Sequence, residues 1–126
     1  MKEQFVTYEI ALKLKELRFD ECCLAVYFKN KFQLVKGFNI NNVDLHMANE
    51  MDAILAPLWQ QVIDFFREKY NIQIEILWRG DMNAFNYKIG TFQYGTYIFS
   101  DKDWKFEEYY EAREQAILKA IELIKK

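Results

Sequence analysis

Two cysteines and one histidine are the side chains of this chain best suited to nucleophilic chemistry. Cys22 and Cys23 are adjacent, and His46 is the single histidine. Histidine is the commonest general base near neutral pH, and an imidazole within hydrogen-bond reach of a thiol can activate it as a nucleophile. Nothing in the sequence brings either cysteine to His46. We therefore interpret the protein as lacking catalytic residues, with a small cysteine-dependent enzyme as an alternative.

A metal site is not indicated either. Structural zinc usually takes four Cys or His ligands, arranged in pairs two to four residues apart, whereas this chain has two adjacent cysteines and one distant histidine. Adjacent cysteines do not form a disulfide framework, and in a reducing compartment a buried thiol behaves as a small apolar group. Motifs for phosphate loops, dinucleotide binding, zinc proteases and serine hydrolases are missing as well. The sequence predicts no metal and no cofactor.

Aromatic side chains give the main indication of a binding surface. Phe, Trp and Tyr make up 17% of the chain. Tyr27 and Tyr97 fall on predicted strands, and Trp104 and Phe106 precede the last predicted helix. Exposed rings on a sheet can stack on the bases of single-stranded nucleic acid, but large rings more often fill a core or bind a protein. We take these four residues as a candidate surface for a protein partner, with single-stranded nucleic-acid binding through sheet tyrosines as an alternative.

The charge balance argues against a nucleic-acid partner. The chain carries 17 Lys and Arg against 19 Asp and Glu, and its net charge is −2. Because the two signs are interleaved, no general attraction to phosphate is expected. The amino terminus lacks the pattern of a signal peptide, and no apolar run approaches the roughly 20 residues of a membrane span. We expect a cytoplasmic protein with no membrane association.

The last third of the chain predicts a three-stranded meander followed by a helix. Ile72, Ile74, Ile76 and Trp78 alternate with polar residues and should point to one side of the first strand. The expected strands are 72–79, 85–89 and 93–99, with turns at 80–83 and 90–92. The expected helix runs over 107–124, with a stripe of alanines that allows close packing on a sheet.

The first half of the chain predicts two longer helices and a hairpin. Thr7 is a suitable N-cap for a helix over 8–17, and Pro57 opens a helix over 57–70. A hairpin is expected over 24–36, with its turn at Asn30–Lys31. Residues 39–55 fit either a short helix or an irregular excursion that ends in an extended piece. Together, residues 1–126 should form a single α+β domain: an antiparallel sheet of about five strands packed with three helices, largely on one face. A homodimer through a sheet edge or a helical face fits this architecture.

The residues at 5–17, 56–70 and 110–124 resemble a family of small uncharacterised proteins from prophages and mobile elements of gut bacteria. Arg18 departs from the glycine expected at the end of the first helix. No activity is established for that family, and it supplies no catalytic residues. The resemblance implies a phage-related accessory role in a bacterial cytoplasm. Our leading hypothesis is a non-enzymatic accessory or interaction module of such an element, which acts through a protein partner.

Overall fold

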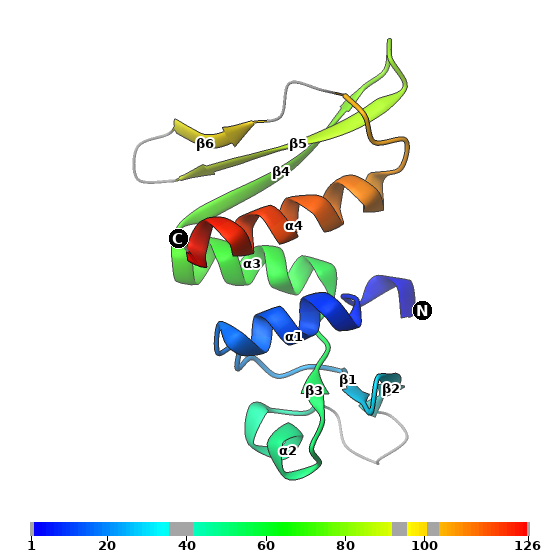
Figure 1. The fold of residues 1–126 in the computed structure, drawn as a ribbon, viewed down its shortest axis with the longest axis vertical. Coiled ribbons are helices and arrows are strands. Elements are labelled where there is room, and N and C mark those ends of the chain that lie inside the picture. Colours follow the sequence, from blue (N-terminus) through cyan, green and yellow to red (C-terminus); the bar gives the residue numbers. More distant parts are fainter. Residues whose placement is uncertain (1, 36–41, 92–95, 101–103, 126) are drawn as a thin grey trace. The chain divides into compact units, whose positions relative to one another are not determined.

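A computed structural model describes residues 2–35, 42–91, 96–100 and 104–125, and for 96–100 it describes the backbone alone. The chain forms two compact units, unit 1 over Met1–Gln61 and unit 2 over Val62–Lys126. Each unit combines helices with an antiparallel sheet, which confirms the α+β class (Figure 1). That all 126 residues act as one domain stays a prediction.

Unit 1 contains a sheet with the strand order β2-β1-β3. Its elements are a 3-10 helix at Lys2–Gln4, α1 (Tyr8–Glu16), β1 (Ala25–Phe28), β2 (Lys31–Leu34), α2 (Leu45–Glu50), β3 (Ile54–Leu55) and the start of α3 (Trp59–Tyr70). The turn between β1 and β2 consists of Lys29 and Asn30, whose φ angles are 52° and 71°. Two such residues make the turn type that matches the twist of a hairpin. The turn expected one residue later is therefore wrong, because Lys29 adopts the left-handed conformation.

The two ends of α1 are capped in different ways. Thr7 is the N-cap as expected, and its hydroxyl accepts a hydrogen bond from the amide of Ile10 at 3.3 Å. At the other end Arg18 has a φ of 62°. The amide of Phe19 donates to the Leu14 carbonyl and the amide of Arg18 donates to the Lys15 carbonyl, both at 3.0 Å. This is a Schellman cap with arginine in the position that glycine usually takes.

Residues 42–55 form a short helix followed by a short strand, where the sequence fitted either a helix or an irregular excursion with an extended end. Asp44 caps the short helix α2 by accepting a hydrogen bond from the Met47 amide at 2.8 Å. The helix ends at Glu50 with Met51 as its C-cap, Asp52 follows with a φ of 57°, and β3 begins at Ile54. Strand β3 pairs with β1, so that Val26 lies opposite Leu55. Both the helix and the extended piece are present, while residues 36–41 lie outside the described part of the chain.

Unit 2 contains a second sheet with the order β4-β5-β6, and α4 packs on β4 and β5 (Figure 1). Its elements after α3 are β4 (Ile72–Arg79), β5 (Ala84–Thr91), β6 (Thr96–Ser100) and α4 (Tyr109–Lys125). The expected single sheet of about five strands is therefore wrong. The described strands form two sheets of three, because the hairpin of unit 1 pairs with β3 instead of joining the meander.

Several element boundaries differ from the predicted ones. Strand β5 continues through Gly90 and Thr91, where a turn was expected, and β6 begins at Thr96. Helix α3 begins at Trp59 instead of Pro57, because Leu58 is its N-cap residue: the Gln61 side chain accepts a hydrogen bond from the Leu58 amide at 3.3 Å. Helix α4 begins at Tyr109 instead of residue 107. The alanine stripe was correct, since the residues of α4 that are buried are Ala112, Ala116, Ile117, Ala120 and Ile121.

Candidate interaction site

Cys23 is a buried structural thiol. Its side chain is 1% exposed and donates a hydrogen bond to the Glu21 carbonyl at 3.4 Å. Burial raises the pKa of the Cys23 thiol to about 12, and the negative charge of Glu21 acts in the same direction. Because the thiolate is the nucleophilic form, Cys23 is poorly suited to catalysis near neutral pH. Cys22, by contrast, is exposed.

His46 lies on the surface of α2. Its side chain is 80% exposed, and its Nε2 atom lies 3.0 Å from Oε1 of Glu50 on the same helix. The backbone of Cys23 does bond to that of Val43, just before α2. Nevertheless the Cys23 thiol is bonded to Glu21 and the imidazole to Glu50, so the pair does not form a nucleophile-and-base arrangement. In the part of the chain that the structure describes, no cluster of three or more Cys, His, Asp or Glu could hold a metal ion.

Tyr27 is a core residue, which makes its assignment to an interaction surface wrong. Its side chain is 4% exposed, and its hydroxyl donates a hydrogen bond to the Val6 carbonyl at 2.7 Å. Its ring contacts those of Tyr8 and Phe32, with centroids 5.4 and 5.8 Å away. The ring is therefore unavailable for stacking on a ligand. Tyr97 lies on β6, where it pairs with Gly90, and its side chain is outside the described part.

Trp104 and Phe106 line an open groove on unit 2 with a volume of about 600 Å³. The other lining residues come from the β4–β5 turn and from the segment before α4: Met82, Asn83, Ala84, Lys105, Glu107 and Glu108. The backbone of Phe106 holds this segment against β5, because the Phe85 amide donates to the Phe106 carbonyl at 2.7 Å. The Phe106 ring lies 6.2 Å from that of Tyr87. We call this feature the aromatic groove.

The β4–β5 turn and Trp104 are joined by a charged side chain. The guanidinium of Arg79 lies over the Trp104 ring at 5.9 Å, and its Nε atom is 2.9 Å from Oδ1 of Asp81. Stacking of arginine on an indole is favourable and orients both groups. Trp104 is half-buried, whereas Met82 in the turn is 51% exposed. Of the groove's lining residues, Trp104 is thus contacted by Arg79, and Met82 places a flexible thioether at the edge.

Carboxylates add a negative side to the aromatic groove. Glu107 and Glu108 are both exposed and line it just before α4, and Glu111 follows in the first turn of that helix. Sequence reasoning placed the first two within the helix and assigned Met82 to an ordinary turn. A large apolar residue in a polar turn, beside consecutive glutamates, was the available signal for this site.

Trp78, which was expected on the same side of β4 as Ile72, Ile74 and Ile76, is exposed. It lies near the end of β4, opposite Phe85, and is 61% exposed. Tyr109, the first residue of α4, contacts the Phe85 ring at 6.0 Å. Toward its turn, the hairpin of β4 and β5 diverges from α4 (Figure 1).

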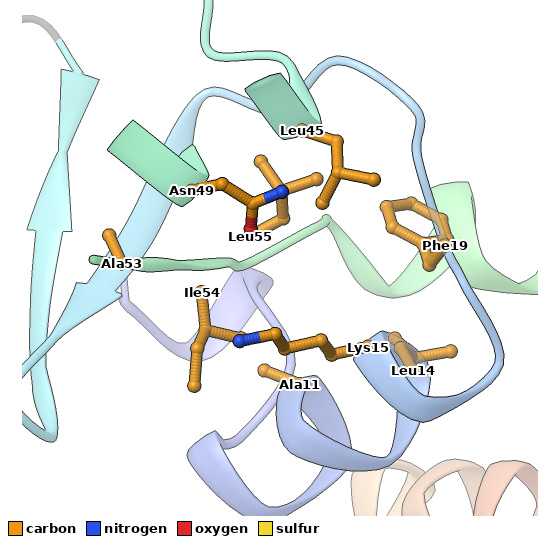
Figure 2. Close-up of a pocket in the computed structure, with 9 residues that line it drawn as sticks. All are labelled: Ala11, Leu14, Lys15, Phe19, Leu45, Asn49, Ala53, Ile54 and Leu55. Atoms are coloured by element: carbon orange, nitrogen blue, oxygen red, sulfur yellow. The ribbon is translucent and has the colours of Figure 1, made fainter. Parts of the chain in front are cut away.

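A second cavity lies in unit 1 and is too small for a metabolite. Its volume is about 10 Å³, which suits roughly one water molecule. Figure 2 shows that Lys15 and Asn49 are the polar residues among otherwise apolar side chains from α1, α2 and β3. Small-molecule sites commonly enclose several hundred Å³. The aromatic groove is therefore the better candidate for binding.

Comparisons with protein-family models, with curated proteins and with solved structures gave no match. Among the described residues, no helix is long and apolar enough to cross a membrane.

Proposed function

We propose that this protein is a non-enzymatic interaction module and that the aromatic groove binds a segment of a protein partner. The carrying observation is the groove itself, about 600 Å³ in volume and lined by Trp104, Phe106 and Met82. Aromatic rings supply much of the binding energy of protein interfaces, and methionine adapts to the shape of its partner. The resemblance to proteins of phage-like elements supports an accessory role for this module in a bacterial cytoplasm.

The chemistry of the groove favours a basic segment with an apolar anchor. An aliphatic or aromatic side chain of the partner would lie against Trp104 and Met82. Lysine or arginine next to that anchor would face Glu107 and Glu108, which line the groove and are exposed. Opposite charges across an interface set its register and raise the association rate.

The same features argue against single-stranded nucleic acid at this surface. The lining contains two carboxylates, Glu107 and Glu108, and one ammonium group, that of Lys105. Binding to single strands depends on a positively charged groove, which this lining does not provide. Tyr27 and Tyr87, which the nucleic-acid alternative would use on the strands, are 4% and 6% exposed. A protein segment is the ligand that the described side chains fit better.

Peptide display against the full-length protein tests this proposal. We expect enrichment of peptides that combine an apolar residue with Lys or Arg. Binding of a selected peptide, measured by fluorescence anisotropy, should weaken at least about tenfold with Trp104→Ala, because a central aromatic anchor often contributes 2 kcal/mol or more. Replacing Glu107 and Glu108 by Lys should reverse the preference of the protein for basic peptides.

Leu24→Ala is the matched control, since Leu24 is also an exposed apolar residue, 49% exposed, but lies in unit 1. It should leave peptide binding unchanged. Equal loss in Trp104→Ala and Leu24→Ala, or failure to enrich any peptide, would contradict the proposal. Binding of an oligothymidylate that high salt removes would favour the nucleic-acid alternative instead.

A further inference from the structure

Strand β4 forms one edge of the sheet in unit 2. It contains eight residues and pairs with β5 along its whole length. On its other side, no strand among the described residues pairs with it. A long edge strand presents a row of backbone N–H and C=O groups without ladder partners, and this row can accept another strand.

The side chains of β4 do not protect this edge in the usual way. Short strands, proline and repeated lysines are common devices that prevent edge-to-edge pairing. Here Ile76 and Leu77 are half-buried and Trp78 is 61% exposed. The charged residues in the same region are one acid, Glu75, and one base, Arg79. The edge is thus apolar and carries both signs of charge.

Two copies of one strand can pair antiparallel only in a limited set of registers. The two-fold axis runs perpendicular to the sheet, and paired side chains lie on the same face. In every allowed register the axis therefore lies midway between one residue and the same residue of the second copy. With the axis at Leu77, Glu75 faces Arg79 of the second copy and Ile76 faces Trp78 of the second copy. Symmetry forms each of these pairs twice.

The neighbouring registers are less favourable. With the axis at Glu75, the two copies of this carboxylate face each other, and like charges directly opposite are destabilising. With the axis at Ile76, Glu75 faces Leu77 and neither charge faces its opposite. Opposite-charge pairs and aromatic pairs with β-branched residues both stabilise neighbouring strands, so the Leu77 register satisfies the most side chains.

We propose that a second copy of this chain binds along β4 in the Leu77 register. The three-stranded sheet of unit 2 in one copy then joins the same sheet of the other copy to form one sheet of six strands. In this pairing Arg79 exchanges its contacts with Asp81 and with the Trp104 ring. Glu75, which faces Lys88 of β5, gains a second cationic neighbour. The side chains of Arg79 and Asp81 are 50% and 65% exposed. Exposed ion pairs contribute little to stability, so their exchange has a small cost. Arg79 contacts Trp104 of the aromatic groove, but none of the interface residues lines the groove. The inference does not depend on the proposed function.

Sedimentation velocity of the full-length protein over a concentration series tests for the dimer. The wild-type protein should dimerise with rising concentration, and Leu77→Lys, which brings two ammonium groups together at the axis, should remain monomeric. Leu24→Lys, an equally apolar-to-charged change in unit 1, should dimerise as the wild type does. A wild-type protein that is monomeric up to its solubility limit would overturn the proposal, as would a dimer that survives Leu77→Lys.

Charge reversal tests the same interface without placing a charge at its centre. Glu75→Arg should weaken the dimer by about tenfold or more, because two like-charge pairs replace two opposite-charge pairs. Glu75→Arg combined with Arg79→Glu should restore it. Circular dichroism should show both variants folded. If the double variant dimerises no better than Glu75→Arg, the pairing of these two residues is wrong.

Cysteine cross-linking tests the register. In a Cys22→Ser background, Leu77→Cys should form an intermolecular disulfide, since residues at the axis face their own equivalents within the range of a disulfide. Ile76→Cys should not, because it faces Trp78 of the second copy. Cross-linking through Ile76→Cys but not Leu77→Cys would overturn the proposed register. A dimer that neither variant cross-links would overturn the proposed interface.

Discussion

The sheets of the two units have three strands each, but they differ in the length of their strands and in the side chains exposed around them. In unit 1 the outer strands are short, four residues in β2 and two in β3, and the first three residues of β1 are buried. In unit 2 both β4 and β5 contain eight residues. The exposed aromatic side chains of the described residues, Trp78, Tyr109 and Tyr110, all belong to unit 2, whereas the exposed large apolar residues of unit 1 are Leu12 and Leu24.

One aromatic residue from each unit illustrates this difference. Tyr27 in unit 1 has two aromatic neighbours and a carbonyl acceptor for its hydroxyl. Trp104 in unit 2 has an arginine over its ring and an open groove beside it. A ring in a saturated environment stabilises the fold, while a ring that is held but half-exposed remains available to a ligand. The proposed binding role therefore falls on unit 2.

Replacing one ring from each unit by alanine should show this contrast most strongly. Tyr27→Ala should lower the free energy of unfolding by about 3–5 kcal/mol, because it removes a buried ring and leaves a cavity. Trp104→Ala should cost about 1 kcal/mol or less, because the side chain is half-buried and borders an open groove. Urea denaturation followed by circular dichroism measures both changes.

Tyr27→Phe refines the same comparison. It keeps the ring but leaves the Val6 carbonyl without its 2.7 Å hydrogen bond, which should cost about 1–3 kcal/mol. Equal destabilisation by Tyr27→Ala and Trp104→Ala would show that the two units do not differ in this respect.

The buried thiol of Cys23 in unit 1 should make the free energy of unfolding depend on pH, with a smaller effect than the loss of the Tyr27 ring. The pKa of this thiol is raised from 9.0 to about 12 in the folded protein, so the folded state keeps a proton that the unfolded state loses. The resulting stability is fully present below about pH 9 and is lost as the pH rises through about 12. At pH 10 the loss should be roughly 1 kcal/mol relative to pH 8. Denaturation at the two pH values measures it.

Burial raises the pKa of Tyr27 too, so Cys23→Ala is the necessary control. This variant should show a weaker loss of stability between pH 8 and pH 10 than the wild type. In the native protein a thiol reagent at pH 8 should label Cys22 and not Cys23, because one is exposed and the other buried. Rapid native labelling of both cysteines would contradict the structural role assigned to Cys23.

Local patterns in the sequence were sufficient where local contacts determine the structure. The bounds of β4, the turn at 80–83 and the Thr7 cap follow from alternation, turn residues and a side-chain hydroxyl. Strand β3 could not be predicted with its partner, because two residues carry no periodicity and their pairing with β1 is long-range. Because the separate sheet of unit 1 includes this pairing of β3 with β1, the presence of two sheets was not predicted either.

The candidate site was predicted in part for the same reason. Trp104 and Phe106 were selected as aromatic residues just before the last predicted helix, and both line the groove. Tyr27 was assigned wrongly because its burial depends on Val6 and Phe32, which reach it only in the folded chain. The contribution of Met82 to the groove likewise depends on the segment before α4, which is distant in sequence.

Helix ends provide the smallest contrast between the units, and one that sequence reasoning could not resolve. With four glycines in the chain, three of the described helices are followed by non-glycine residues in the left-handed conformation. They are Arg18 after α1 and Asp52 after α2 in unit 1, and Asn71 after α3 in unit 2, with φ angles of 62°, 57° and 59°. We compare Arg18 with Asn71. Arginine pays a larger steric cost there than asparagine does.

Glycine at these two positions should therefore act unequally. Arg18→Gly should raise the free energy of unfolding by about 0.5–1 kcal/mol, because relief of the left-handed strain exceeds the entropy that glycine adds to the unfolded chain. Asn71→Gly should change it less, because asparagine already tolerates this conformation. Urea denaturation of both variants measures the difference. Destabilisation by Arg18→Gly would show that the arginine side chain contributes more to the folded state than its backbone strain costs, which would add a stabilising contact to the surface of unit 1.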